Sequence, residues 1–258
     1  MSGMGAPPVA TGGKTVPVAG TVHSWDVSTG VDGPGTRFVV FTRGCPLRCL
    51  YCHNPETWKT RGGHRADSEE MIAQAAQYVP FIAASGGGAT VSGGEPLLQP
   101  AFTGALLRGF QGLGLHTALD TSGYLGARAD KGLLAATDLV LLDVKSWDQA
   151  LYKRLTSVEL HPTLAFARRL AELAIPIHIR FVLVPGLTDE AANVDGVARF
   201  SASLGNVERV DVLPFHKLAA GKYRTLGIPF PLAGTPAPTG PQVAEACARF
   251  AAAGLAVF

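Results

Sequence analysis

The sequence predicts an α/β fold: a partial (β/α)6 barrel of the TIM type, open rather than closed. Short apolar segments alternate along the chain with longer segments of helical pattern, which is typical of a parallel sheet covered by helices. About six such units fit into the 258 residues, fewer than the eight of a closed barrel. No break in composition divides the middle of the chain. We therefore expect one domain, residues 20–258, after a flexible N-terminal tail, residues 1–19, that is rich in Gly and Pro.

The expected strands are short segments bounded by glycine, proline or polar residues. Most are apolar on both faces, as strands buried in a parallel sheet are. They are Thr21–Asp26, Arg37–Thr42, Ala89–Ser92, His116–Leu119, Asp138–Val144, Ile177–Val184, Arg209–Leu213 and a short Leu255–Phe258.

The expected helices lie between these strands. Asp67 or Ser68 can cap the first, and Glu69 and Glu70 stand in its first turn, where negative charge suits the helix dipole. We expect Gly221–Pro241 to be irregular because it is rich in Gly and Pro. The helices are expected from Asp67 or Ser68 to about Ala84, and over Gln99–Leu113, Ala127–Ala136, Thr163–Ala174, Asp189–Leu204 and Gln242–Ala253.

The composition excludes several classes of protein. With 47% hydrophobic residues and a formal net charge of +2, the chain is neither disordered nor basic enough to indicate nucleic-acid binding. No apolar run is long enough to span a membrane, and the first residues lack the pattern of a secretory signal. We therefore expect a cytoplasmic protein, and nothing in the sequence indicates an oligomer, so we expect a monomer.

Polar residues recur at the carboxyl ends of the expected strands. In parallel α/β folds the functional site is built at this edge of the sheet. Any one of these residues could be an ordinary exposed loop residue, but their recurrence after several strands indicates a site. They are Glu95, Asp120, Asp143, Lys145 and His216, with Arg180 inside a strand.

Three of the four cysteines stand in one short loop directly after the strand Arg37–Thr42. Three residues separate Cys45 from Cys49, and two separate Cys49 from Cys52. Soft thiolates select zinc or iron–sulfur clusters rather than magnesium or calcium. Three thiolates on one loop can cap three irons of a cubane cluster and leave the fourth iron without a protein ligand.

Zinc is the main alternative, and it would make the chain a zinc-stapled binding protein. A structural zinc site is closed by four ligands, but a second Cys-x-x-Cys is missing, and His53 adjoins Cys52 too closely for a relaxed tetrahedral site. A redox disulfide between Cys49 and Cys52 would leave Cys45 unexplained. The fourth cysteine, Cys247, lies in an expected helix and is expected to be an ordinary buried thiol.

The spacing C-x-x-x-C-x-x-C after a first strand resembles that of the radical S-adenosylmethionine (SAM) superfamily. Further motifs follow in order along the chain. Together they make the chain similar to the pyruvate formate-lyase activating enzymes from about Gly20 to Phe258, and this resemblance implies a partial barrel of the radical SAM type. The motifs are VDGPGTRFVVFTRGCPLRCLYCHNPETW, ASGGGATVSGGEP, HTALDTSG, TDLVLLDVK, IRFVLVPG, LPFHKLAAGKY and GLAVF.

The resemblance implies a [4Fe–4S] cluster held by Cys45, Cys49 and Cys52, the catalytic residues of the family. SAM then binds the open iron, and the reduced cluster cleaves it to methionine and a 5′-deoxyadenosyl radical. Residues that match the family's SAM-contacting positions are Tyr51, Cys52, His53, Gly93, Gly94, Glu95, Asp143, Val144, Lys145, Arg180 and His216.

The resemblance also implies individual roles at these positions. The glycine pair, Gly93 and Gly94, lets a backbone edge approach the methionine amino group. Glu95 is expected to hold that amino group or the loop. Lys145 and Arg180 are expected to pair with the methionine carboxylate. Asp143 is expected to accept from a ribose hydroxyl or to help bind a cation, and His216 to lie on the ribose or adenine side. Tyr51 and His53 are expected to border the adenine and to shield the cluster.

A monovalent cation, Na+ or K+, is a further expectation from the resemblance. The matching residues are Asp120, Thr121, Asp143 and Leu141, the last through its backbone carbonyl. Hard oxygen ligands suit such an ion. A turn or capping residue is an equally good interpretation of Asp120.

The substrate implied by the resemblance is pyruvate formate-lyase, from which the radical removes a hydrogen of one glycine. The resemblance places this chemistry in anaerobic glucose metabolism, and flavodoxin or ferredoxin is the expected electron donor. Between Cys52 and the Ser-Gly-Gly-Glu motif no cysteine occurs, so a single cluster is expected. The alternative is a radical SAM enzyme that acts on another glycyl-radical enzyme or on a small molecule.

Overall fold

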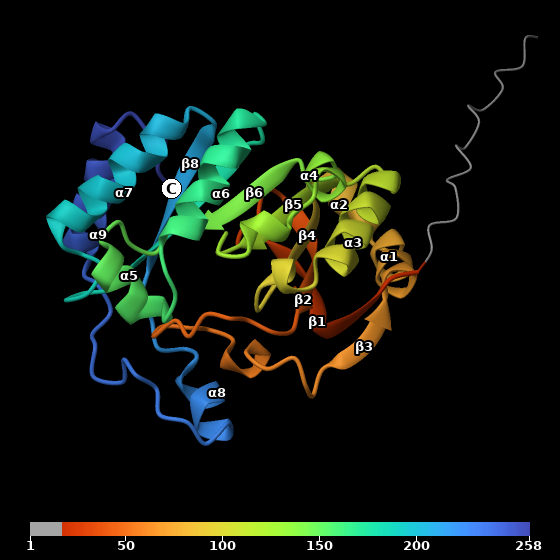
Figure 1. Ribbon diagram of the computed structural model, residues 1–258, viewed down its shortest axis with the longest axis horizontal. Helices are drawn as coiled ribbons and strands as arrows, with labels where there is room; N and C mark the ends of the chain where they lie inside the picture. Colours follow the sequence, from red (N-terminus) through yellow and green to blue (C-terminus); the bar gives the residue numbers. More distant parts are fainter. Residues whose placement is uncertain (1–16) are drawn as a thin grey trace, which may run out of the picture.

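The computed structural model describes residues 17–258, and their central feature is an eight-stranded sheet with the order β3-β1-β2-β4-β5-β6-β7-β8 (Figure 1). From β2 to β8, neighbouring strands pair in parallel. β1 pairs antiparallel with β2 and with β3 at one edge. The strands are β1 Ala19–Thr29, β2 Thr36–Thr42, β3 His64–Asp67, β4 Gly88–Gly93, β5 His116–Thr121, β6 Leu139–Asp143, β7 Ile177–Leu183 and β8 Val207–Pro214.

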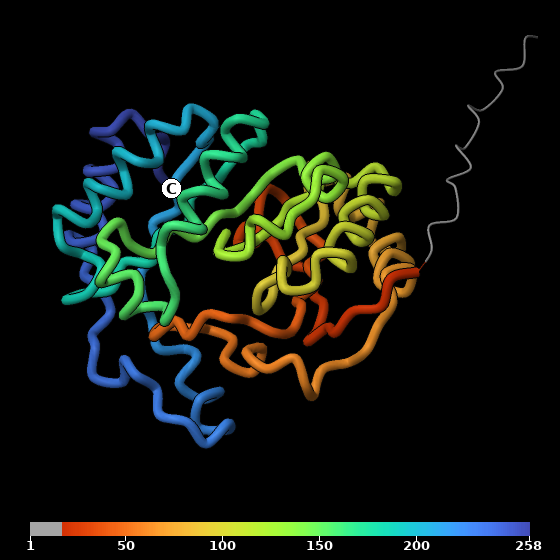
Figure 2. Tube along the Cα trace, viewed as in Figure 1, coloured from red at the N-terminus to blue at the C-terminus, as the bar shows by residue number. Residues whose placement is uncertain are grey.

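The sheet is open, because β3 and β8 lie at its two ends and do not pair with each other. The predicted α/β class and the partial, unclosed barrel are therefore confirmed, with six parallel strands in its main part. Val257 bridges to Val210 of β8 in parallel, so the expected final strand is reduced to an isolated bridge. Figure 2 shows this end of the chain beside β8.

Most of the helices cover the outer face of the sheet, while the helix Ala220–Thr225 lies apart from it, beside the 3-10 turn Pro55–Thr57 (Figure 1). None of the described helices is both long and apolar enough to cross a membrane. They are α1 Ser68–Ala76, α2 Val79–Ala84, α3 Pro100–Gly112, α4 Lys131–Ala135, α5 Gln149–Thr156, α6 His161–Glu172, α7 Ala191–Leu204, α8 Ala220–Thr225 and α9 Gly240–Ala252, with short 3-10 turns at Pro55–Thr57, Pro96–Leu98 and Gly126–Arg128.

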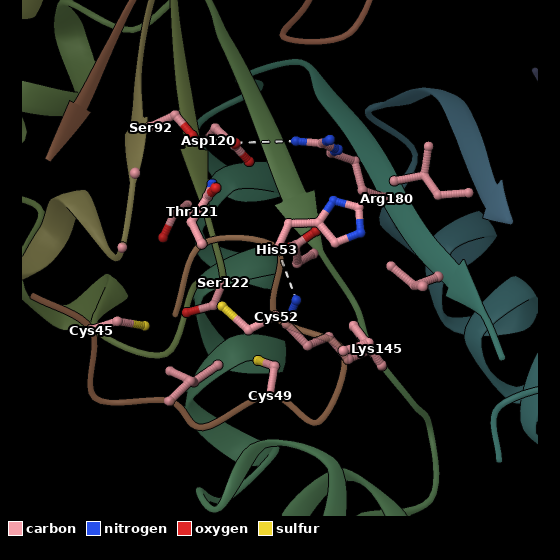
Figure 3. Close-up of a pocket in the computed structure, with 18 of the residues that line it drawn as sticks. Cys45, Cys49, Cys52, His53, Ser92, Asp120, Thr121, Ser122, Lys145 and Arg180 are labelled. Atoms are coloured by element: carbon pink, nitrogen blue, oxygen red, sulfur yellow. Dashed lines mark hydrogen bonds and ion pairs between the residues drawn. The ribbon is translucent and has the colours of Figure 1, made fainter. Parts of the chain in front are cut away.

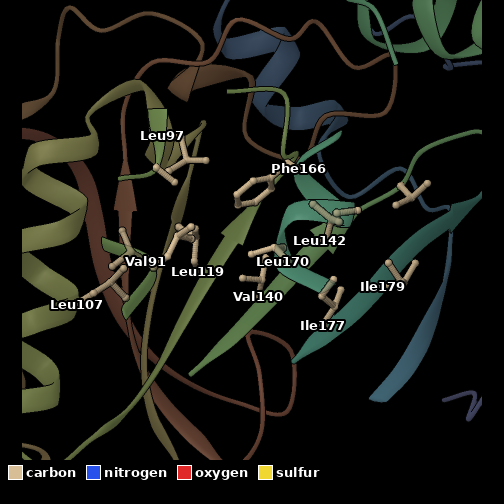
Figure 4. Packing of buried hydrophobic residues seen from close by; sticks show 14 of the residues in the cluster. Val91, Leu97, Leu107, Leu119, Val140, Leu142, Phe166, Leu170, Ile177 and Ile179 are labelled. Atoms are coloured by element: carbon tan, nitrogen blue, oxygen red, sulfur yellow. The ribbon is translucent and has the colours of Figure 1, made fainter. Parts of the chain in front are cut away.

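The hydrophobic core lies between the sheet and these helices. Alternate strand residues such as Leu119, Val140 and Leu142 are fully buried and pack with Phe166 and Leu170 of α6 (Figure 4). Because successive strand residues point to opposite faces, the residues between them point to the inner, concave face. That face carries polar side chains near the carboxyl ends of the strands, so the core leaves it free for a site.

The structure differs from the predicted elements in several places. The single helix expected up to Ala84 is two, α1 and α2, because Pro80 lacks a backbone N–H and begins a new helix. Asp67 caps α1 as expected, accepting from Glu70 N at 2.9 Å. The helix expected over Ala127–Ala136 is a 3-10 turn followed by the short α4.

Three elements were missed. The short edge strand β3 and the helix α5 were not expected, and α8 overlaps the start of the stretch expected to be irregular. β3 and α8 are short and carry weak local patterns. α5 had a local signal that was overlooked, because Asp148 caps its N-terminus and its sequence is amphipathic. Residues 1–16 of the expected N-terminal tail lie outside the described residues; Val18 is hydrogen-bonded to Ser68, and β1 begins at Ala19.

Candidate active site

A cavity of about 480 Å³ opens at the carboxyl ends of the parallel strands. Cavities of this size bind cofactors and drug-sized ligands. Figure 3 shows the cysteine loop on one side of it and the ends of β4 to β7 on the other. The predicted site residues that line it are Cys45, Cys49, Tyr51, Cys52, His53, Gly93, Gly94, Asp120, Thr121, Asp143, Lys145, Arg180 and His216.

Backbone hydrogen bonds hold the cysteine loop over this cavity. Gly44 N donates to Thr57 O at 2.7 Å and Cys45 N to Trp58 O at 3.1 Å, which ties the start of the loop to the segment that follows it. Arg48 N donates to Thr156 O at 2.7 Å, which ties the middle of the loop to the end of α5. The loop is thus anchored on both sides.

The three loop thiols are free and partly buried. Burial raises the pKa of each, and for Cys49 it raises the pKa to about 11 against the opposing effect of Lys145. Thiols bind iron as thiolates, so metal binding here must release protons. Cys247 lies on α9, away from the cavity, and packs against the main core, in keeping with the ordinary thiol expected there.

The donor set fits a cluster better than a single ion. Among residues 17–258, no three His, Cys, Asp or Glu side chains are grouped so that they could hold one metal ion. A cubane cluster spreads its three protein ligands over three irons, so its thiols need only face one space. Cys45, Cys49 and Cys52 do this by lining the same cavity.

The glycine pair joins the end of β4 to the cysteine loop. Gly94 N donates to Thr42 O at 2.9 Å, and Glu95 N donates to Gly44 O at 2.9 Å. A Cβ at Gly93 would lie 2.2 Å from Thr42 N, and one at Gly94 would lie 2.4 Å from Gly44 O. Only glycine allows the two segments to approach this closely.

The Glu95 carboxylate is fully buried and does not line the cavity. It accepts hydrogen bonds from Thr121 Oγ1 at 2.6 Å, Ser122 N at 3.0 Å, the Ser122 hydroxyl and Leu97 N at 3.1 Å. Burial raises the pKa of Glu95, and these donors oppose the rise. Of the two roles expected for Glu95, the contacts favour holding the loops.

Two ion pairs line the cavity. Arg180 Nη1 lies 3.1 Å from Asp120 Oδ2, which also accepts from Ser92 Oγ at 2.6 Å. Asp120 raises the pKa of Arg180 above its usual range. Lys145 Nζ donates to Asp143 Oδ2 at 2.9 Å; burial alone lowers the pKa of Lys145, but Asp143 raises it well above the usual value.

Aromatic side chains border the cluster loop. Lys145 Nζ lies 5.6 Å from the centre of the Tyr51 ring, whose hydroxyl is buried without a hydrogen-bond partner. The rings of His53 and His216 lie 4.3 Å apart between centroids, although 163 residues separate them in the chain, the difference of their sequence numbers. The fold therefore brings together His53 and His216, which were predicted as site residues separately.

Three of the predicted site residues do not line the cavity. Glu95 faces the loops, Val144 lies in the main core, and the Leu141 side chain packs with Ala118 and Leu139. The Leu141 expectation concerned only its backbone carbonyl, so the side chain does not test it.

Several lining residues were missed. Trp58 belongs to the CHNPETW stretch and Asp32 to the VDGPG stretch; both stretches carried the resemblance, and the residues themselves were not singled out. Ser92 could have been found as the residue before the glycine pair. The other lining residues are Val31, Leu47, Asn54, Ser122, Val182, Leu213, Pro214 and Phe215.

Comparison with known proteins decides the family. A family model described as Radical SAM superfamily matches residues 39–194. The chain belongs to the radical SAM superfamily. The match spans the cysteine loop, both ion pairs and the glycine pair, so the predicted membership is confirmed.

Curated relatives narrow the family further. The chain is 41% identical over 224 residues to the pyruvate formate-lyase 1-activating enzyme of Escherichia coli K12, covering 86% of this chain and 91% of that protein. It is 42% identical over 235 residues to the pyruvate formate-lyase-activating enzyme of Staphylococcus epidermidis, covering 88% and 93%. This radical SAM chain thus belongs among the pyruvate formate-lyase activating enzymes.

Solved structures share the fold. A domain of a pyruvate-formate lyase-activating enzyme from Bacteroides vulgatus superposes with a TM-score of 0.55 at 27% identity, covering 67% of this chain and 98% of that one. A radical SAM methyltransferase from Sphaerobacter thermophilus superposes with a TM-score of 0.63 at 19% identity over 94% of this chain and 76% of that one. The second likeness shows the fold alone. Membership of the superfamily implies a [4Fe–4S] cluster and SAM as cofactors.

Proposed function

We propose that this radical SAM enzyme activates pyruvate formate-lyase by removing a hydrogen atom from one of its glycines. The cavity carries the proposal, because three free thiols and the cations of Arg180 and Lys145 face one space at the end of the sheet. The names of the curated relatives give the substrate protein. When bound, the cluster supplies the electron that splits SAM into methionine and a 5′-deoxyadenosyl radical.

The residues of the cavity bind and orient SAM in this proposal. Arg180 and Lys145 are held in place by Asp120 and Asp143, and they face the methionine carboxylate. Gly93 and Gly94 present backbone atoms to the methionine amino group. The paired rings of His53 and His216, with Tyr51, contact the nucleoside end. The supporting contacts fix these side chains before the ligand arrives, which is how a binding site orients a reactant.

The mouth of the cavity is the proposed entry for the glycine of the substrate. Val31, His53 and Pro214 line the cavity and are also exposed, so the segments that carry them border its opening. Asp32, whose carboxylate accepts from Ser28 Oγ at 2.6 Å, belongs to the same rim. In this proposal an extended loop of another protein reaches the thiol side of the cavity through this opening.

The remaining expectations belong to this proposal. A flavodoxin or ferredoxin supplies the electron, and the enzyme acts as a monomer in the cytoplasm during anaerobic glucose metabolism. The Na+ or K+ site at Asp120, Thr121, Leu141 and Asp143 stays a prediction. Its carboxylates are engaged with Arg180 and Lys145, and the Thr121 hydroxyl donates to Glu95.

Electron paramagnetic resonance tests the proposal. Anaerobically reconstituted enzyme is mixed with reductant, SAM and pyruvate formate-lyase, and a doublet glycyl-radical signal is expected on the lyase. Cys49→Ser is expected to abolish both the signal and most of the bound iron, whereas Cys247→Ser should leave both unchanged. If SAM is cleaved and the lyase shows no radical, the assignment of the substrate is wrong.

A further inference from the structure

A second depression lies against the cysteine loop. It measures about 350 Å³, and Cys45 and Trp58 line both it and the SAM cavity. The loop therefore has two faces: an inner one toward SAM and an outer one toward this depression. Figure 2 shows the segment 43–62 in orange along one side of the molecule, outside the sheet.

The outer depression is basic. Arg48, Lys59 and Arg61 line it and are exposed. Within residues 17–258, none of the three has a carboxylate within salt-bridge distance, and residues 1–16 contain no Asp or Glu. No carboxylate lines the depression either. This is a concentrated positive charge on a chain whose formal net charge is only +2.

The cations are attached to the backbone that holds the cluster ligand. Arg48 Nη1 donates to Cys45 O and to Leu47 O, each at 2.7 Å, and its guanidinium lies 5.1 Å from the centre of the Trp58 ring. Arg43 binds the carbonyls of Lys59 and Gly62 at 3.1 and 2.7 Å, which fixes the segment that presents Lys59 and Arg61. The charges thus sit on a rigid surface beside Cys45.

We propose that this basic face, formed by Arg48, Lys59 and Arg61 around Cys45 and Trp58, is the docking surface for an acidic one-electron carrier protein. The inference rests on the proposed function, which requires a reduced cluster. One electron leaves the carrier, which is oxidised by one electron, and enters the cluster, which is reduced by one. Electron transfer slows steeply with distance, and at this face a cluster ligand lines the outer surface.

Charge complementarity selects the partner. Electrostatic attraction accelerates encounter between proteins of opposite charge and weakens as salt rises. Electron-transfer complexes bury little surface, so three exposed cations around one depression are a sufficient contact. The opposite face of the loop is left for SAM and the substrate glycine, so carrier and substrate do not compete for one surface.

The experiment measures reduction of the cluster rather than turnover. Reconstituted enzyme is mixed in a stopped-flow instrument with flavodoxin in its hydroquinone state, and in parallel with dithionite. For Lys59→Glu/Arg61→Glu, reduction by flavodoxin at about 20 mM salt is expected to slow by roughly tenfold or more, with a matching loss of flavodoxin binding in calorimetry. Reduction by dithionite should keep its rate, because a small reductant needs no docking surface.

Arg168→Glu/Arg199→Glu is the matched control. It changes the net charge by the same amount at exposed positions on α6 and α7, whose residues line neither cavity. The proposal is overturned if flavodoxin reduces the cluster of the Lys59/Arg61 variant as fast as that of the unmodified enzyme. It is also overturned if the control variant is slowed by the same factor. Loss of pyruvate formate-lyase binding in place of flavodoxin binding also overturns it. Failure of the proposed function is separate, since the unmodified enzyme would then form no glycyl radical even with dithionite.

Discussion

Thr121 Oγ1 donates a hydrogen bond to Glu95 Oε1 over 2.6 Å, inside the protein and out of reach of solvent. The contact joins the loop after β4 to the end of β5. Glu95 N also donates a hydrogen bond to Gly44 O, so the same residue connects the loop after β4 to the cysteine loop. Through its buried carboxylate and its backbone N–H together, Glu95 links three segments of the active site.

Replacing Glu95 by Ala is expected to destabilise the protein by about 2–4 kcal/mol, because buried donors of Thr121 and Ser122 lose their acceptor. Urea unfolding of the metal-free protein measures this. Glu69→Ala, at an exposed position in the first turn of α1, serves as control and should change the free energy of unfolding by less than about 1 kcal/mol, the usual size of a helix-dipole contribution. Equal unfolding midpoints for the two variants would show that the buried network contributes nothing.

Gly94→Ala is expected to cost about 1–3 kcal/mol and to lower the iron content after reconstitution. The added methyl group would meet the carbonyl of Gly44, which precedes Cys45, and backbone cannot move aside cheaply. Gly112→Ala is the matched control, because a Cβ there meets nothing within 4 Å in the last turn of α3. Iron content after reconstitution and thermal unfolding are measured for both variants. Full iron content in Gly94→Ala would contradict the close approach of the two segments.

Asp120 and Arg180 are expected to couple by about 1–3 kcal/mol in a double-mutant cycle of Asp120→Ala and Arg180→Ala. Their side chains are only 13% and 20% exposed, so removing one partner leaves a poorly solvated charge. Chemical unfolding of the four proteins measures the coupling. The exposed pair Lys153–Glu159 is closer, at 2.6 Å, but water screens it, so its coupling should be smaller. A larger coupling at the exposed pair would contradict this reasoning.

His178 is expected to make the protein less stable as the pH falls below about 6.5, the usual pKa of histidine. Burial, and then the nearby Arg209, lower the pKa of His178 in the folded protein, while Glu208 opposes them. The unfolded chain therefore binds the proton more readily. This contribution to stability is present above the unfolded pKa and is lost as the pH falls through the folded pKa.

Unfolding free energies between about pH 5 and pH 8 measure the His178 effect. His178→Gln keeps a polar side chain but cannot titrate, so its stability should depend less on pH than that of the unmodified protein. The same slope in both proteins would show that His178 does not contribute.

Much of the fold and of the site followed from local patterns. Apolar runs bounded by turn residues predicted the six parallel strands, because burial on both faces requires such runs. The missed β3 has no such pattern, and its pairing with β1 stabilises it. The missed α5 had a local signal, the N-cap residue Asp148. The break before α2 was also missed, although Pro80 supplied the local signal for it.

The sequence by itself determined the cysteine spacing, the order of the strand-end motifs and the family they indicate, because these are properties of neighbouring residues. Tertiary structure decided which side chains meet. It turned Glu95 inward to the loops, set His53 against His216, paired Arg180 with Asp120 and gave the cysteine loop a basic outer face. Such contacts depend on how strands and loops are arranged in space, and separation along the chain does not encode them.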